Sequence, residues 1–282
     1  MDMAERFDLF NDAKKQIRVV AHRGACGGNI PCNTMAAYNI AIKQGADMIE
    51  IDVNRSADGT LFIFHPGMEH ALLNDPVHSV PKMTDAEIAA LRYVNQDDTP
   101  TQFGLNTLDE IFEAFKGRCY INVDKFWDNP AQIAETIRRH DIADQVVVKS
   151  SLSREVLSVL EETAPELMFM PIVQKVFPEH GEMLKKNVNY IGAEVLFDDE
   201  NDEVCSDAFI AKMHADGKLV WVNSIIYSYR AQLAAGHSDD TALTESEEKG
   251  WGWLADKGFD LIQTDWPLML IEFLKKTGRY ER

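Results

Sequence analysis

The stretch VVAHRGACGGNIPCNT, from Val19 to Thr34, starts as an apolar, β-branched run and then changes character. His22 and Arg23 follow the apolar run directly, and glycines and a proline come before the next helix former, Met35. We interpret it as a buried strand that delivers a histidine and an arginine to a loop, with a helix behind the loop. The same order of strand, loop and helix recurs along the chain.

Short apolar runs alternate with segments of helical periodicity, the order typical of a parallel sheet covered by helices. Eight runs are predicted as strands, each followed by a helix candidate: 17–22, 48–54, 119–124, 146–150, 168–173, 190–197, 218–224 and 260–265. Eight such repeats close into a TIM (β/α)8 barrel, an α/β fold of about 250 residues. The chain has 282 residues, and we expect residues 1–282 to form a single domain of this fold.

An extra strand is predicted at 60–65, because Asp58 and Gly59 favour a tight reversal out of the second strand. The segment at about 66–106 is too long for a plain connection and contains a helix of its own. We therefore expect an insertion after the second strand that shapes a substrate site. Helices are predicted to start at Asn33 or Thr34, Thr84, Thr107 and Ser153, and to stop at Gly45 and Gly117.

Composition limits the classes of function. No apolar run approaches the roughly 20 residues of a membrane span, so no stable membrane insertion is expected. The N-terminal segment MDMAERFDLFNDAKKQIR lacks the features of a secretory signal, which predicts a cytoplasmic location. A net charge of -18 opposes binding to nucleic acid and to anionic lipid. The expected partner is a small molecule, and the oligomeric state stays open.

Three acidic residues are predicted to meet at the carboxyl ends of the strands, the face of a barrel that holds active sites. Glu50 and Asp52 are two apart in one strand, so both point to the same face, about 6.6 Å apart along the chain. Asp124 ends the next barrel strand. Together they offer hard oxygen ligands for Mg²⁺ or Ca²⁺. The alternative is that they pair with Arg and Lys across the barrel mouth.

Two histidines and two cations surround these acids in the predicted fold. His22 ends the first strand and His65 ends the added hairpin strand. One neutral imidazole can take a proton from a nucleophile while the other, protonated, donates to a leaving oxygen. Arg23 and Lys125 supply the fixed positive charge that a phosphoryl oxygen prefers.

Several motifs resemble those of the glycerophosphodiester phosphodiesterases. They are HRG from His22, GADMIEIDVNRSADGTLFIFH from Gly45, NTLDEIFEAFKG from Asn106, VDK from Val123, WVNS from Trp221 and LIQTDWP from Leu261, in the family's order. The resemblance implies a TIM barrel that uses a divalent cation and two histidines to cleave glycerophosphodiesters into sn-glycerol 3-phosphate and an alcohol.

Carried over position by position, the resemblance makes His22 and His65 the acid/base pair. Glu50, Asp52 and Asp124 become the metal ligands, Arg23 and Lys125 the phosphate contacts, and Asn223 a polar contact to substrate. A first attack by the glycerol 2-hydroxyl, giving a cyclic phosphate that water then opens, is implied as well. Two alternatives stay open: a phospholipase D-like lyase that releases a cyclic phosphate, and a non-catalytic barrel that binds phosphodiesters.

The sequence departs from the family pattern at three points, one of which is the segment after His65: it reads PGMEHALLNDP in place of the usual run rich in Asp and Thr. Cys32 stands where the family usually has an acid, and Asp124 is one methylene shorter than the usual Glu. Cys26 and Cys32 share one loop, either as ordinary reduced thiols, the usual state in the cytosol, or as a redox pair.

Four further residues have two interpretations each. Glu194 and Lys149 either line the site or form a barrel-top salt bridge, and Trp221 and Trp266 either wall the site or belong to the core.

Overall fold

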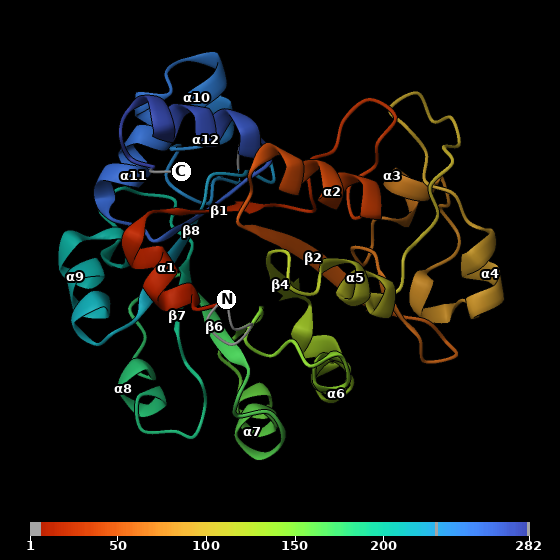
Figure 1. The fold of residues 1–282 in the computed structure, drawn as a ribbon, viewed down its shortest axis with the longest axis horizontal. Coiled ribbons are helices and arrows are strands. Elements are labelled where there is room, and N and C mark those ends of the chain that lie inside the picture. The colour runs from red at the N-terminus through yellow and green to blue at the C-terminus, as the bar shows by residue number, and fades with distance from the viewer. Residues whose placement is uncertain (1–6, 229–230, 281–282) are drawn as a thin grey trace.

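The computed structural model describes residues 7–228 and 231–280, and its strands form a closed parallel barrel. The barrel strands are β1 (Arg18–Ala21), β2 (Met48–Arg55), β4 (Tyr120–Asp124), β5 (Val146–Ser151), β6 (Met168–Val173), β7 (Gly192–Val195), β8 (Leu219–Asn223) and β9 (Leu261–Thr264). The order is β1-β9-β8-β7-β6-β5-β4-β2, and β1 also pairs with β2, which closes the ring. The predicted TIM barrel is therefore confirmed (Figure 1).

The predicted extra strand is β3 (Leu61–Ile63), which pairs antiparallel with β2 through the register Asn54↔Phe62. It lies at the edge of the sheet rather than in the ring. The reversal between the two strands contains Gly59 at a φ of 100°, a conformation that glycine adopts without steric penalty.

The helices lie around the outside of the barrel, apart from α1 at the end where the strands begin and α3 and α4 in the segment between β3 and α5 (Figure 1). They are α1 (Leu9–Lys15), α2 (Met35–Gln44), α3 (Glu69–Leu73), α4 (Asp85–Ala90), α5 (Leu108–Phe115), α6 (Pro130–His140), α7 (Arg154–Thr163), α8 (His180–Met183), α9 (Asp207–Ala215), α10 (Asp239–Thr244), α11 (Trp253–Lys257) and α12 (Pro267–Lys276). Short 3-10 turns occur at η2 (Val80–Lys82), η3 (Phe126–Asp128) and η4 (Glu203–Cys205), and a π-helical turn at η5 (Glu248–Gly252).

The predicted helix starts agree with the observed N-caps. Thr34, Thr84, Thr107 and Ser153 each accept a hydrogen bond from a backbone N–H in the first turn of their helix, and Thr84 and Thr107 form capping boxes. Gly45 ends α2 in the left-handed region. The helix α5 ends at Phe115, with Lys116 as its C-cap and Gly117 directly after it.

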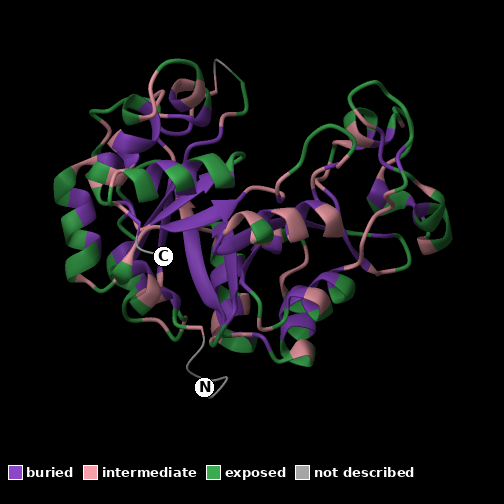
Figure 2. Cartoon of the chain, turned by 45° about the horizontal axis from the view of Figure 1, so that its top comes forward, coloured by how far each residue is buried: buried purple, intermediate pink, exposed green. Residues whose placement is uncertain are grey.

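Alternation along the strands divides the apolar residues into two layers. Outward side chains such as Val19, Ile49 and Ile121 pack under the helices. Inward side chains near the strand starts, such as Met48, pack together inside the barrel with Leu9 of α1. Helix α1 therefore plugs the end of the barrel where the strands begin, and the buried strands lie at the centre of the molecule in Figure 2.

The segment between β3 and α5 has a small apolar cluster of its own on one side of the barrel (Figure 1). Its buried members are Phe62, Phe64, Leu73, Val80, Met83, Ile88 and Tyr93. It reaches the loop after β1, where Asn29 Nδ2 donates to Gln102 Oε1 over 3.1 Å. The predicted insertion thus borders that loop.

Among the described residues, the structure has no helix with both the length and the apolar character needed to cross a bilayer. Residues 1–6, the first part of the segment on which the expected cytoplasmic location rests, lie outside the described residues.

Gly24 is the position where the loop after β1 meets α2 most closely. Its φ is +82°, and an added Cβ would lie 2.7 Å from the Ala37 carbonyl carbon. Gly28, in the same loop, has a φ of +58° and no atom within 4 Å of an added Cβ.

We expect Gly24→Ala to destabilise the protein more than Gly28→Ala. Both substitutions strain the backbone by about 1–2 kcal/mol, and only the first adds an overlap with fixed backbone atoms. Urea unfolding of both variants beside the parent protein measures the difference. Equal losses of unfolding free energy would show that the close approach to Ala37 does not constrain the loop.

Candidate active site

Polar side chains fill the inside of the barrel toward the carboxyl ends of the strands. They occupy the same inward positions that carry apolar side chains nearer the strand starts, because residues i and i+2 share a face. On β2, Met48 is followed inward by Glu50 and Asp52. The buried residues of this polar layer in the other strands are Asn122, Lys149, Glu194, Asn223 and Gln263.

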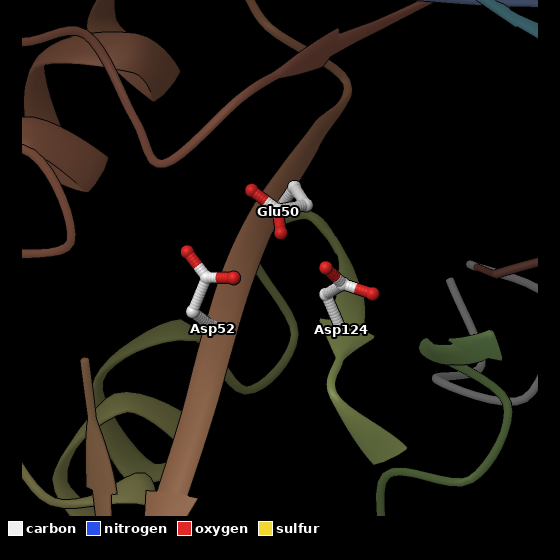
Figure 3. Close-up of side chains that lie close together, drawn as sticks. All are labelled: Glu50, Asp52 and Asp124. Carbon is white, nitrogen blue, oxygen red and sulfur yellow. The ribbon is translucent and has the colours of Figure 1, made fainter. Parts of the chain in front are cut away.

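The three predicted metal ligands lie together in this layer. The parallel register of β2 and β4 places Asp52 opposite Asp124, and Glu50 lies two residues before Asp52 on the same face. One ligand atom from each of the three carboxylates lies within 4.8 Å of the others. Glu50 is 2% exposed and Asp52 is 0% exposed. In Figure 3 the carboxylates from the two strands point toward one another.

The carboxylate cluster has the chemistry of a cation site. Asp52 Oδ1 and Asp124 Oδ1 are buried without a hydrogen-bond partner, which is costly unless a cation or a donor is present. Burial and the neighbouring charge of Asp52 raise the pKa of Glu50 to about 7. Carboxylate oxygens at this spacing suit a divalent cation such as Mg²⁺ or Ca²⁺.

The basic partners of the alternative interpretation are present as well. Arg23 Nε lies 2.9 Å from Asp52 Oδ2, and Lys125 Nζ lies 2.7 Å from Asp124 Oδ2. The same lysine is 3.8 Å from Asp52 Oδ1. A guanidinium group and an ammonium group therefore face the three carboxylates.

Arg23 lies two residues after β1 and Lys125 lies directly after β4, and both adopt left-handed backbone conformations, with φ of 56° and 61°. The backbone N–H of Arg23 donates to Glu50 Oε2 over 3.0 Å. Burial disfavours the charged form of Lys125, but Asp124 and Asp52 outweigh it and raise the pKa of this lysine. The tight turns thus return both side chains toward the cluster.

His22 is held by Asp265, which follows β9. The imidazole Nδ1–H donates to Asp265 Oδ1 over 2.8 Å, and the side chain is 14% exposed. Burial opposes its protonation, but the hydrogen bond to Asp265 and the charge of Glu50 outweigh it and raise the pKa of His22. The bond at Nδ1 leaves Nε2 available for substrate.

His65 also lies beside the carboxylate cluster. Its Nδ1–H donates to the carbonyl of Pro66 over 2.9 Å, and its Nε2 lies 4.0 Å from Asp52 Oδ1. Burial, together with the charges of Arg23 and Lys125, lowers the pKa of His65 although Asp52 acts in the other direction. The two predicted acid/base residues therefore border one group of carboxylates, with environments that shift their pKa values in opposite directions.

Two supporting residues were missed by the sequence analysis. Asp265 stands at the end of a predicted strand, the same signal that identified His22 and Asp124. Asn33 entered only as a possible helix cap, whereas its Nδ2 donates to Asp52 Oδ2 over 2.8 Å. Its Oδ1 accepts from the Tyr38 hydroxyl over 2.7 Å, which fixes the amide orientation.

Asp239, at the start of α10, anchors the chain around Asp265. One of its oxygens accepts from Ser224 Oγ, Trp251 Nε1 and Thr264 Oγ1 over 2.6, 2.7 and 2.8 Å. The other accepts from the backbone N–H of Asp265 over 2.8 Å. Asp239 is thus a buried carboxylate that accepts four hydrogen bonds. It fixes the position of Asp265, which in turn bonds to His22.

Asn223 belongs to a second polar group in the barrel. Its Nδ2 donates to Glu194 Oε1 over 2.5 Å, and Glu194 forms an ion pair with Lys149 over 2.7 Å. The salt bridge considered for this pair from the sequence is therefore present. Trp221 is fully buried beneath them, with Lys149 Nζ 4.4 Å from the centre of its ring.

An apolar pocket of about 380 Å³ adjoins the His22–Asp265 pair. Asp265 itself lines it, and so does Trp266, which is 50% exposed. The other lining residues include Cys26, Ile30, Leu268 and Met269. Of the two tryptophans considered for a wall of the site, Trp266 lines a pocket and Trp221 belongs to the core.

Curated proteins similar to this chain include a lysophospholipase D and glycerophosphodiester phosphodiesterases. The chain is 24% identical over 290 residues to "Lysophospholipase D GDPD1" of Rattus norvegicus, which covers 94% of this chain and 90% of that protein. A glycerophosphodiester phosphodiesterase of Caldanaerobacter subterraneus is 26% identical over 167 residues, and the match spans 63% of its length. A family model described as a domain of unknown function, DUF4996, matches residues 169–274.

Solved structures share the fold. A glycerophosphoryl diester phosphodiesterase from Parabacteroides distasonis superposes with a TM-score of 0.77 at 18% identity, covering 96% of this chain and 93% of that one. An Oleispira antarctica phosphodiesterase in complex with the product sn-glycerol-3-phosphate gives a TM-score of 0.68 at 21% identity, covering 93% and 98%. The predicted resemblance to the glycerophosphodiester phosphodiesterases is thus confirmed, by matches in sequence and by the shared TIM-barrel fold.

Proposed function

We propose that the protein is a metal-dependent glycerophosphodiester phosphodiesterase that hydrolyses its substrates to sn-glycerol 3-phosphate and an alcohol. The enzyme class, a phosphoric diester hydrolase, is the one that its relatives carry. The observation that carries the proposal is the cluster formed by the carboxylates of Glu50, Asp52 and Asp124, the first two of them buried, bordered by two cations and two histidines. A small phosphodiester is the ligand that such a mixed site recognises.

The site residues divide between charge and proton transfer. Arg23 and Lys125 neutralise the phosphoryl oxygens as negative charge develops on them. A divalent cation, Mg²⁺ or Ca²⁺, held by the three carboxylates would add Lewis-acid polarisation of a phosphoryl oxygen. We propose that Asn223, whose amide bonds to Glu194, makes a polar contact with the substrate.

The histidines act as the acid/base pair. In neutral His65 the proton is on Nδ1, which donates to Pro66, so Nε2 can accept a proton from the attacking glycerol 2-hydroxyl. His22, held by Asp265, protonates the leaving alcohol oxygen. The resulting cyclic phosphate is opened when water attacks phosphorus with the proton transfers reversed.

Product identification tests the proposal. The protein is incubated with glycerophosphodiesters, lysolipids and bis(p-nitrophenyl) phosphate, and products are assigned by phosphorus NMR. Glycerol 3-phosphate is expected. A cyclic phosphate as the sole final product would assign a lyase, and binding without turnover of any substrate would assign a non-catalytic barrel.

We expect His22→Ala and His65→Ala each to lower kcat by a factor of about 10² or more, because each removes one proton transfer. Steady-state rates and circular dichroism are measured on the same preparations. His70→Ala, an exposed histidine in α3, serves as the control and should keep parent activity. Two folded histidine variants with near-parental turnover would contradict the acid/base assignment.

Removal of the cation should abolish activity and lower Tm, because the three carboxylates would then repel one another. After exhaustive EDTA treatment, each ion is titrated back while activity and thermal unfolding are followed. Since Asp124 is shorter than Glu, we expect Mg²⁺ to serve at least as well as the larger Ca²⁺. Asp52→Asn should make Tm insensitive to EDTA. Full activity in metal-free protein would refute the site, whereas rescue by Ca²⁺ alone would refute only the ion.

A second candidate function follows from the apolar pocket beside His22. The exposed side chains of Trp266, Leu268 and Met269 would suit a phosphodiester whose alcohol or glycerol carries an acyl chain. The rat relative is named as a lysophospholipase D, which agrees with such a substrate class. Lysophospholipids are therefore a second candidate substrate class for the same site, beside deacylated diesters.

Trp266→Ala distinguishes these substrate classes. If the pocket binds an acyl chain, we expect KM for a lysophospholipid to rise about tenfold, a loss of ~1.4 kcal/mol, with KM for glycerophosphocholine unchanged. Val77→Ala, which removes an exposed apolar side chain far from the pocket residues in sequence, is the control. Parallel changes for both substrates would argue against a role for the pocket in acyl-chain binding.

A further inference from the structure

Two free cysteines face each other across the loop that follows β1. Cys26 and Cys32 lie on the two sides of this loop, close enough for each thiol to shift the pKa of the other. The loop is closed by a bond from the Asn33 N–H to the Arg23 carbonyl over 2.9 Å. Between the cysteines, Gly27 and Ile30 exchange two backbone hydrogen bonds of 3.0 Å. The chain thus folds back on itself and brings the two sulfurs together.

The two thiols differ in exposure and in acidity. Cys26 is exposed, and the hydrogen bond from Cys32, helped by His22, lowers its pKa to about 7 although burial acts in the other direction. The neighbouring Cys26 and burial raise the pKa of Cys32 well above its usual range. Near neutral pH this combination gives an accessible thiolate beside a protonated thiol, the arrangement of an attacking and a resolving cysteine.

Residues at both ends of the loop contact the carboxylate cluster. Arg23 contacts Glu50 through its backbone N–H and Asp52 through its guanidinium group. Asn33, directly after Cys32, donates to Asp52. A covalent link between the cysteines would therefore connect two segments that each position a side chain against Asp52.

We propose that Cys26 and Cys32 form a site of reversible oxidation by hydroperoxides, in which a disulfide alters how the loop holds Arg23 and Asn33. The Cys26 thiolate attacks the peroxide oxygen, giving a sulfenic acid and, after protonation, water or an alcohol. The Cys32 thiol then attacks the Cys26 sulfur, and the sulfenic hydroxyl leaves as water with the thiol proton. Two thiols are oxidised and one hydroperoxide is reduced.

Mass spectrometry of the full chain tests the bond. Trypsin cuts after Arg23 and Lys43, so both cysteines fall in one peptide, 24–43. After stoichiometric hydrogen peroxide and alkylation, this peptide should be unalkylated and lighter by two hydrogens, and dithiothreitol should restore two alkylation sites. Cys119 and Cys205 are buried and should stay reduced, as internal controls. A peptide that remains alkylated at both cysteines overturns the proposal.

Variants separate the two steps. In Cys32→Ser the reaction should stop at a Cys26 sulfenic acid that dimedone captures, and in Cys26→Ser the Cys32 thiol should remain alkylatable. Persistent sulfenic acid in the parent protein, despite the presence of Cys32, would overturn the resolving role.

The effect on the site rests on the proposed function and is measured separately. We expect the fully linked protein to show a severalfold change in KM for bis(p-nitrophenyl) phosphate, reversed by dithiothreitol and absent from the peroxide-treated Cys26→Ser/Cys32→Ser double variant. An unchanged KM overturns the effect on Arg23 and Asn33. If the reduced protein turns over no substrate, the proposed function fails while the peptide masses still decide whether the disulfide forms.

Discussion

Repulsion among three clustered carboxylates, two of them buried and the third half-buried, is the constraint on which the mouth of this barrel depends. With ligand atoms within 4.8 Å of one another, each ionised pair repels by about 3.5 kcal/mol at an effective dielectric constant near 20. Arg23 and Lys125 offset part of this repulsion, and Asn33 offsets more by donating to Asp52. Burial and the remaining charge of Asp52 raise the pKa of Glu50, and a cation bound among the carboxylates would lower the repulsion further.

The donors and cations that offset this repulsion lie at residues with unusual backbone conformations. Arg23, Asn33 and Lys125 all have positive φ, which costs of order 1–3 kcal/mol each and persists only where the surroundings determine it. At each of them the surroundings include a contact to one of the cluster carboxylates. The strained backbone positions are therefore those whose side chains or N–H groups contact the carboxylates, and they lie in the loops that follow β1 and β4.

Local signals made most of the fold predictable. The strands are short β-branched runs, and the N-caps are single Thr or Ser residues that bond within their own helix. Glu50 and Asp52 could be assigned to one face because the period of a strand is two. Asp265 and Asn33 escaped because their partners are far away in sequence: Asp265 bonds to His22, 243 residues before it, and Asn33 bonds to Asp52 in the next strand. The repeated strands predict a closed barrel, but no local pattern says which side chains meet across neighbouring strand ends, such as His22 after β1 and Asp265 after β9.

Inside the barrel, apolar side chains lie near the strand starts and polar side chains lie near the carboxyl ends. Met48, Tyr120 and Trp221 belong to the apolar cluster at the end plugged by α1, and the residues two positions further along these strands are Glu50, Asn122 and Asn223. Hydrophobic burial at the closed end thus supplies free energy that the polar layer does not, because desolvation offsets much of the gain from buried ion pairs. The mouth can then hold unpaired carboxylate oxygens that a self-contained polar core could not tolerate.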